Sequence, residues 1–132
     1  MNFGLKKRFE IQEDGTIVAR AGVQTNCSGI AAVRICITST EGTGIVFSLS
    51  QKEFNNERLD DLVVSGKAIP EAYKTAVFKG AQDAYEESGL SKGIQFELIE
   101  ALVHPIDARE LRFIEVGKTA VNGWVEHRRC IR

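Results

Sequence analysis

Two short polar segments hold the side chains of this 132-residue chain that are best suited to chemistry. The first contains Asn26, Cys27, Ser28 and Gly29, and the second begins at His104. A cysteine thiol next to a histidine can act as a nucleophile, so catalysis by Cys27 and His104 is one hypothesis. Such a site also needs a group that orients the histidine and an oxyanion hole, and the sequence identifies neither. We therefore expect a protein that is not an enzyme.

The segment after His104 has the pattern of a helix start. Glu110 follows Asp107 by three residues, which is the spacing of a capping box with aspartate as the N-cap. Arg109 and Arg112 come in the first turns of this helix, where they form either part of a local basic surface or an ordinary solvated helix face. Asp107 and Arg109 are thus candidates for a structural role and for a binding role.

The sequence signatures of nucleotide, hydrolase and metal sites are missing. There is no Gly-x-x-x-x-Gly-Lys-Ser/Thr loop, no Gly-x-Gly-x-x-Gly between a strand and a helix, and no Gly-x-Ser-x-Gly turn. The 3 cysteines show no Cys-x-x-Cys spacing, and the 2 histidines are not at metal-ligand spacing. We expect no cofactor, no metal and no bound nucleotide, and we expect reduced cysteines.

The composition is that of a single globular domain over residues 1–132. The chain is 43% hydrophobic, and its 17 basic residues are balanced by 18 acidic ones. A general polyanion binder would be more basic, so the bulk charge does not favour nucleic acid, although it leaves room for a local basic patch. No apolar run approaches the roughly 20 residues that span a bilayer, and the first ten residues carry charges where a secretory signal is apolar. We expect a cytoplasmic protein with no membrane partner.

The first half of the sequence alternates between apolar and polar residues, the pattern of strands with one buried face. Residues 6–12 and 16–24 flank an Asp-Gly pair, which predicts a hairpin. Further strands are expected at residues 31–40 and 45–50. Residues 51–67 have no clear pattern and predict a loop with a short helical turn.

In the second half the apolar period changes to three and four residues, which indicates helices. The first is expected from Ile69 to Ser88, with Pro70 in its first turn and Gly89 as a left-handed cap. The second follows Asp107 and buries a stripe that includes Trp124.

Between the helices, residues 95–103 are apolar at most positions and predict a central strand. Strict alternation assigns Phe96, Leu98 and Leu102 to one face and Ile99, Ala101 and Val103 to the other. Two helical stripes can both be buried on one face of a sheet, so we expect an α+β two-layer sandwich.

Three segments of the chain, in their order and spacing, resemble domain IV of translational GTPases of the elongation factor G type. The first two match a Gly-Gly-x-Ile-Pro motif and an Ala-Val-x-x-Gly helix, through Gly66, Ile69, Pro70, Ala76, Val77 and Gly80. The third matches a His-x-x-Asp-Ser-x-Glu-x-x-Phe segment, through His104, Asp107, Glu110 and Phe113. The resemblance covers residues 24–125, most of the chain.

The resemblance implies the fold of the second domain of small-subunit ribosomal protein five. That fold has a four-stranded mixed sheet, two helices on one face and a left-handed strand–helix–strand connection. The resemblance also implies a tip that contacts the ribosome or its RNA. On this chain the tip would comprise Asn26, Ser28, Gly29, His104, Asp107 and Arg109.

The chain departs from the family at three points. The family's Gly-Gly-x-Gly-Gln-Tyr tip loop is replaced by residues 26–32, which lack the glycine run and the aromatic, and the family's serine after the aspartate is Ala108. The GTPase domain is absent from the sequence, so we expect a translation-factor-like module without GTPase activity. It is either a free-standing homologue or part of a longer protein.

A second hypothesis is a protein–protein or homodimerisation module that kept the fold and lost RNA binding. Such a module would use the sheet face opposite the helices, which a two-layer sandwich leaves open. Arg34, Cys36 and Thr38 are expected on that face.

Overall fold

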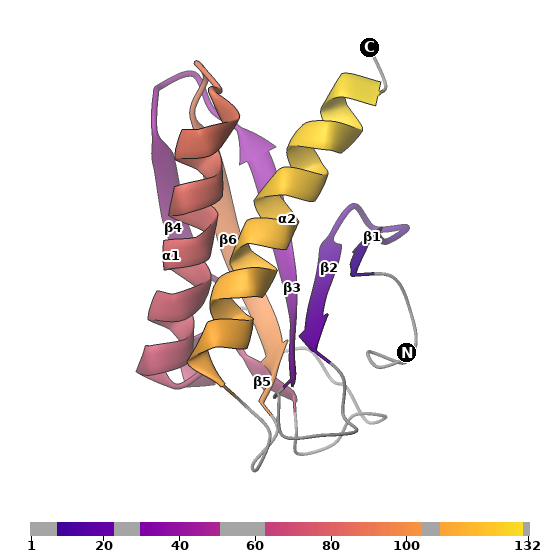
Figure 1. Cartoon of the computed structure of the whole chain (residues 1–132), viewed down its shortest axis with the longest axis vertical. Coiled ribbons are helices and arrows are strands. Elements are labelled where there is room, and N and C mark those ends of the chain that lie inside the picture. The colour runs from indigo at the N-terminus through magenta and orange to yellow at the C-terminus, as the bar shows by residue number, and fades with distance from the viewer. Residues whose placement is uncertain (1–7, 23–29, 51–62, 104–108, 131–132) are drawn as a thin grey trace.

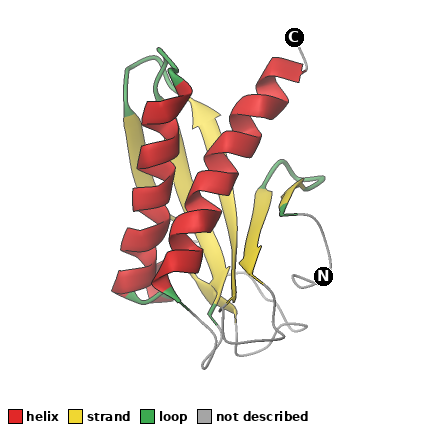
Figure 2. Ribbon diagram, in the orientation of Figure 1, coloured by secondary structure: helices red, strands yellow, loops and turns green. Residues whose placement is uncertain are grey.

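The computed structural model describes residues 8–22, 30–50, 63–103 and 109–130. This part of the chain is α+β, and both helices lie in front of one sheet, as Figures 1 and 2 show. The elements, in chain order, are β1 (Phe9–Ile11), β2 (Ile17–Gly22), β3 (Ile30–Ser39), β4 (Ile45–Leu49), β5 (Val63–Ser65), the 3-10 turn η2 (Gly66–Ala68), α1 (Glu71–Ser88), β6 (Ile94–Leu102) and α2 (Glu110–Cys130).

The predicted Asp-Gly hairpin is present between β1 and β2. Gly15 has a φ of 89°, a left-handed conformation that glycine adopts without a Cβ clash. The hydroxyl and the backbone N–H of Thr16 both donate to Asp14 Oδ1, at 2.7 and 2.9 Å. These contacts fix a register in which Ile11 lies opposite Ile17.

The sheet is mixed and has 6 strands in the order β1-β2-β3-β6-β4, with β5 also paired to β6. β4 runs parallel to the first half of β6, and β5 runs antiparallel to its second half. The expected count of four strands is therefore wrong. That count is what the resemblance implies, whereas the sequence pattern also predicts the strand that contains β1. β5 has 3 residues, too few to show a periodic pattern, and lies in the segment predicted as a loop.

β6 is central, as predicted, but a bulge changes the phase of its side chains. Leu98 lies opposite Ile35 and Glu100 lies opposite Arg34, so Ile99 is an extra residue between the two pairs. An extra residue of this kind reverses the face to which all following side chains point.

The face assignment from strict alternation is consequently wrong beyond the bulge. Ala101 packs in the core beneath the helices together with Phe96 and Leu98. Leu102, which was expected there, lies opposite Ala32 and outside that cluster.

The ends of the helices agree with the predictions in part. Gly89 ends α1 with a φ of 73°, as expected of a left-handed cap. Pro70 is the N-cap of α1 and thus lies just outside its first turn. α2 begins at Glu110, and the carbonyl of Arg109 accepts the N–H of Phe113 at 3.3 Å. Glu110 is therefore the first residue of α2. The expected cap, Asp107, lies outside the described residues, so the capping box stays a prediction.

Two glycines allow the helices to cross in close contact. A Cβ atom on Gly80 of α1 would lie 2.0 Å from the carbonyl oxygen of Ile114, and one on Gly117 of α2 would lie 2.1 Å from that of Val77. One turn before Val77 and Gly117, the rings of Tyr73 and Phe113 stack with 4.5 Å between their centroids. The backbones of α1 and α2 therefore touch where any larger residue would separate them.

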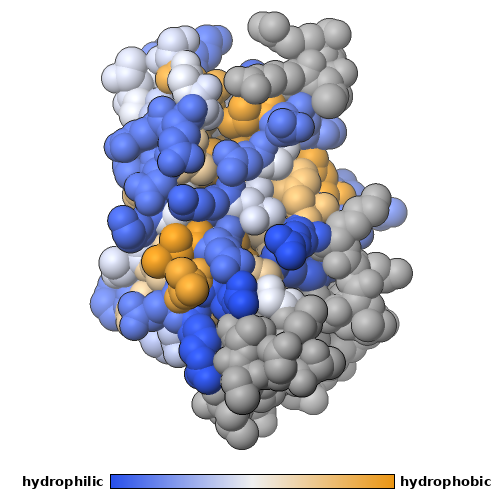
Figure 3. Space-filling view, viewed as in Figure 1, coloured by the Kyte–Doolittle hydropathy of each residue, from blue (hydrophilic) through white to orange (hydrophobic). Residues whose placement is uncertain are grey.

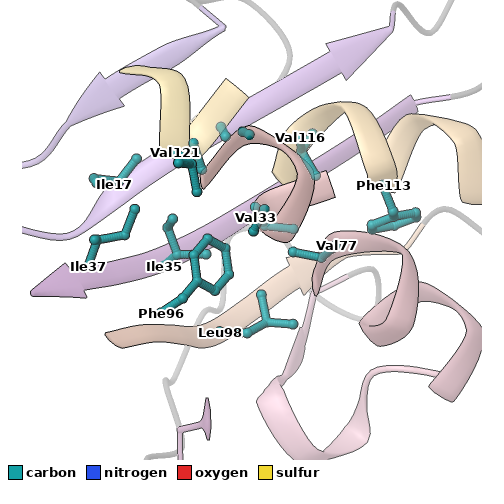
Figure 4. Close-up of a cluster of buried hydrophobic side chains, with 14 of the residues drawn as sticks. Ile17, Val33, Ile35, Ile37, Val77, Phe96, Leu98, Phe113, Val116 and Val121 are labelled. Carbon is teal, nitrogen blue, oxygen red and sulfur yellow. The ribbon is translucent and has the colours of Figure 1, made fainter. Parts of the chain in front are cut away.

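The core lies between this helix pair and the sheet. Figure 4 shows side chains from the sheet and from both helices converging there, among them Val33, Ile35, Val77, Phe96 and Val121. All of them are at most 1% exposed. The apolar stripe predicted on the first helix is confirmed, since its members from Ala76 to Tyr85 are buried.

The C-terminal turns of α2 are held against the sheet. The guanidinium of Arg128 lies 4.8 Å from the ring centroid of Trp124, which is buried. The same guanidinium donates to Ser39 Oγ at 2.6 Å. Arg128 thus links the helix to the end of β3.

Candidate functional site at one end of the sheet

The two segments predicted to form a tip are attached to the same end of the sheet. The last residue of β2, Gly22, lies opposite the first residue of β3, Ile30. Two residues further along β3, Ala32 lies opposite Leu102, the last residue of β6. The connections at residues 23–29 and 104–108 therefore both leave the sheet here, and we call this end of the molecule the tip end.

Of the six predicted site residues, the structure describes only Arg109. It is exposed and directly precedes α2, and its carbonyl also accepts the N–H of Arg112 at 3.0 Å. The others, Asn26, Ser28, Gly29, His104 and Asp107, lie outside the described residues, and so does Cys27. The Cys27–His104 hypothesis thus stays a prediction.

Both helices begin close together near the tip end (Figure 1). Their N-terminal turns line an open groove of about 260 Å³, and its lining includes Glu71, Lys79, Glu110 and Ile114. The positive ends of two helix dipoles favour an anion. Glu71 and Glu110 occupy the first turns, however, and their charges offset that field. The groove by itself is not an anion site.

Above the tip end, the sheet face opposite the helices contains a buried ion pair. Arg34 Nε donates to Glu100 Oε1 at 2.8 Å, and the two side chains are 10% and 3% exposed. Arg34 Nη1 also donates to Thr16 Oγ1 at 3.1 Å. The bulge at Ile99 makes the pair possible, because without it Glu100 would point into the core beneath the helices.

The ion pair extends to the β1–β2 turn. Thr16, which accepts from Arg34, donates its hydroxyl to Asp14. These bonds from Thr16, and to a smaller extent the charge of Arg34, hold the pKa of the Asp14 carboxyl below its ordinary value of 3.8. Arg20 of β2 forms a second ion pair, with Glu10 of β1, at 3.2 Å. The network connects the hairpin turn, β3 and β6.

Sequence reasoning missed this network, although a signal was present. Arg34 is the one charge of β3, and Glu100 is one of two glutamates, with Glu97, in the largely apolar β6. Buried charges are normally paired, so two such residues in neighbouring strands are candidates for one ion pair. The sequence does not indicate the bulge in β6, and it is this bulge that sets Arg34 and Glu100 opposite each other.

The face proposed for homodimerisation is not open where it was expected to be. Arg34 is 8% exposed and bonded to Glu100. Cys36 is half-buried, and Thr38 is exposed. Arg34 therefore contributes an ion pair to this face and not an exposed side chain, and the homodimerisation hypothesis stays a prediction.

The described surface of the helix layer is mostly polar. Figure 3 shows hydrophilic residues over most of the helix layer, with apolar surface in separate patches. Across residues 8–22, 30–50, 63–103 and 109–130 no group of three or more His, Cys, Asp or Glu side chains could hold a metal ion. In the same ranges no helix is long and apolar enough to cross a membrane.

No protein-family model matches the chain, and no curated protein sequence matches it either. We therefore base its function on its residues and its fold.

Proposed function

We propose that this chain is a non-enzymatic, translation-factor-like module that contacts the ribosome or its RNA through the tip end. The observation that carries the proposal is the strand register. It attaches the connections at residues 23–29 and 104–108 to one end of the sheet. The first connection stands at the place of the tip loop of elongation factor G domain IV, and the second contains His104 and Asp107, which match the motif of that domain.

The course of the chain supports the proposed fold relationship to the second domain of small-subunit ribosomal protein five. β4 and β6 are parallel neighbours joined through α1. In Figure 1 both strands run downward, β4 lies to the left of β6, and α1 lies in front. A connection with this course is left-handed, the sense that the resemblance implies and the opposite of nearly all strand–helix–strand units.

Charge at the tip end supports a contact with phosphate. Arg109 is exposed at the start of α2, next to the connection that contains His104. An exposed arginine can bind phosphate through two parallel hydrogen bonds. The proposed partner is thus ribosomal RNA, with no nucleotide and no cofactor bound by the chain itself.

Co-sedimentation with purified small ribosomal subunits across a salt series tests the proposal. We expect binding that weakens steeply as salt rises, because phosphate contacts release counterions. Arg109→Ala should weaken binding and lower the salt slope by about 1. The double variant His104→Ala with Arg109→Ala should bind less still. Absence of binding at low salt would refute a ribosomal function.

Lys92 provides a matched control. It is also an exposed single positive charge, but it lies between α1 and β6, at the end of β6 opposite to the tip end. Lys92→Ala changes the net charge by the same amount as Arg109→Ala. Equal losses from the two variants would indicate a general charge effect and would contradict a specific tip.

A further inference from the structure

We propose that two copies of this chain associate through the outer edge of β4, so that their sheets join across an antiparallel β4–β4 pair. β4 is the last strand in the sheet order, and within the described ranges it pairs with β6 alone. An edge strand presents a row of backbone N–H and C=O groups that can pair with another strand. This inference does not depend on the tip end or on its partner.

The hydrogen bonds to β6 show which backbone groups point outward. Gly44 and Ser50, just before and just after β4, both bond to β6: the carbonyl of Gly44 accepts at 3.0 Å and the N–H of Ser50 donates at 3.0 Å. Successive residues of a strand direct these groups to opposite sides. The N–H and C=O groups that point away from β6 therefore belong to Ile45, Phe47 and Leu49.

One register satisfies all of these groups. In an antiparallel pair, residues that exchange two hydrogen bonds alternate with residues that exchange none. If Phe47 lies opposite Phe47 of the second copy, Ile45 lies opposite Leu49, and these are the hydrogen-bonded positions. A register shifted by two residues would leave some of the outward groups without a partner. The strand is thus best matched by itself.

The side chains of β4 do not oppose such pairing. The strand reads Ile-Val-Phe-Ser-Leu and has none of the charges, prolines or bulges that protect exposed edges. The opposite edge of the sheet differs. β1 has only 3 residues and includes Glu10, which is paired with Arg20. Among the described strands that pair with one neighbour, β1, β5 and β4, only β4 combines length with an uncharged sequence.

An apolar rim runs along the same edge. Phe47 stacks on Phe78 of α1, with 4.5 Å between the ring centroids, and both rings are only half-buried. A two-fold axis at Phe47 would place the rings of one copy near those of the other. On α1, Lys74 lies one turn before Phe78 and Gln82 lies one turn after it. The two-fold axis would bring Lys74 of one copy toward Gln82 of the other, so α1 adds no pair of like charges.

Sedimentation velocity of the full chain over a concentration series tests the proposal. We expect a reversible monomer–dimer equilibrium. Val46→Lys is the informative variant, because Val46 is 56% exposed and lies on the sheet face away from Phe47. In the proposed register Val46 of each copy is a diagonal neighbour of the other, about 7–8 Å away. The like charges should raise the dimer dissociation constant by about tenfold or more.

A charge swap makes the test specific to this register. Val46→Glu alone should weaken the dimer as Val46→Lys does, and an equimolar mixture of the two variants should form heterodimers. Leu111→Lys is the matched control, since Leu111 is 65% exposed but lies on α2. It should leave the dimer unchanged, and circular dichroism should show that all three variants are folded.

Three outcomes would overturn the proposal. The first is a wild-type chain that stays monomeric at high micromolar concentration. The second is a dimer that Leu111→Lys weakens and Val46→Lys does not, which would assign association to α2. The third is failure of the mixed variants to restore association, which would exclude the Phe47-centred register.

Discussion

Gly80 of α1 faces the carbonyl oxygen of Ile114 of α2 so closely that a Cβ atom on the glycine would lie 2.0 Å from that oxygen. Gly117 makes the reciprocal approach to Val77, at 2.1 Å. Since the atoms that a Cβ would meet belong to the backbone, a side chain cannot be accommodated by rotating a neighbour. The helices would have to move apart.

We predict that Gly80→Ala lowers the free energy of unfolding by about 1–3 kcal/mol, the usual cost of overpacking a core. Urea denaturation followed by circular dichroism measures the change. Gly42→Ala is the control, because a Cβ there would meet nothing within 4 Å. If both substitutions cost the same, the close helix contact is not what Gly80 maintains.

Breaking the Arg34–Glu100 ion pair should strongly destabilise the fold. Glu100→Ala leaves the buried Arg34 charge without its carboxylate and should lower the free energy of unfolding by about 3–5 kcal/mol. Replacing both residues by apolar ones, Arg34→Met with Glu100→Leu, should recover most of that loss. Chemical denaturation of Arg34→Met, Glu100→Leu and the double variant gives the coupling energy.

An exposed pair provides the comparison for this cycle. Lys79 and Asp83 of α1 lie 3.7 Å apart, with side chains 63% and 36% exposed. Asp83→Ala should change the free energy of unfolding by less than about 1 kcal/mol. A similar small effect of Glu100→Ala would mean that the carboxylate is solvated and that the buried pair is not formed.

Tyr85 should stabilise the end of the sheet that lies opposite to the tip end. Its hydroxyl donates to the carbonyl of Lys92 at 2.8 Å and accepts the N–H of Gly44 at 3.0 Å. Tyr85→Phe removes both bonds and should cost about 1–3 kcal/mol, because two partly buried backbone groups lose their partner. Hydrogen exchange should show faster exchange of the Gly44 amide, and an unchanged rate would contradict the contact.

The pKa of Asp14 should depend on Thr16. Thr16→Val removes the hydroxyl that contributes most to lowering this pKa, so the value should rise toward 3.8 while staying below it, since the backbone N–H still donates. Because the pKa is lowered in the folded state, Asp14 stabilises the fold above its ordinary pKa. That contribution is lost as the pH falls through the lowered value. A carboxyl-detected NMR titration of both proteins measures the shift.

Local features of this fold could be predicted from the sequence. The Asp14-Gly15 turn and the Gly89 cap each depend on residues adjacent in the chain, and the structure confirms both. The stripe on α1 follows from periodicity alone, because one helix face is buried along its whole length.

Features that depend on a distant partner could not be predicted in this way. The bulge at Ile99 exists because β6 must match β3, and no residue near Ile99 indicates it. β5 is defined only by its pairing with β6. The second helix was expected to follow Asp107 directly, whereas the observed α2 begins at Glu110. The candidate site shares this limit, since only strand register attaches the two connections that contain most of its residues to one end of the sheet.

The extra residue in β6 also has a consequence for variation in chain length. If Ile99 were deleted, Glu100 would follow Leu98 directly and still lie opposite Arg34, and Ala101 would still lie opposite Val33. The strand would become regularly pleated without moving any later side chain to the other face. The deletion would cost the burial of the Ile99 side chain, which is 4% exposed, but would leave the pairing of the later residues unchanged. We therefore expect chain-length variation among homologous chains to be better tolerated here than elsewhere in β6.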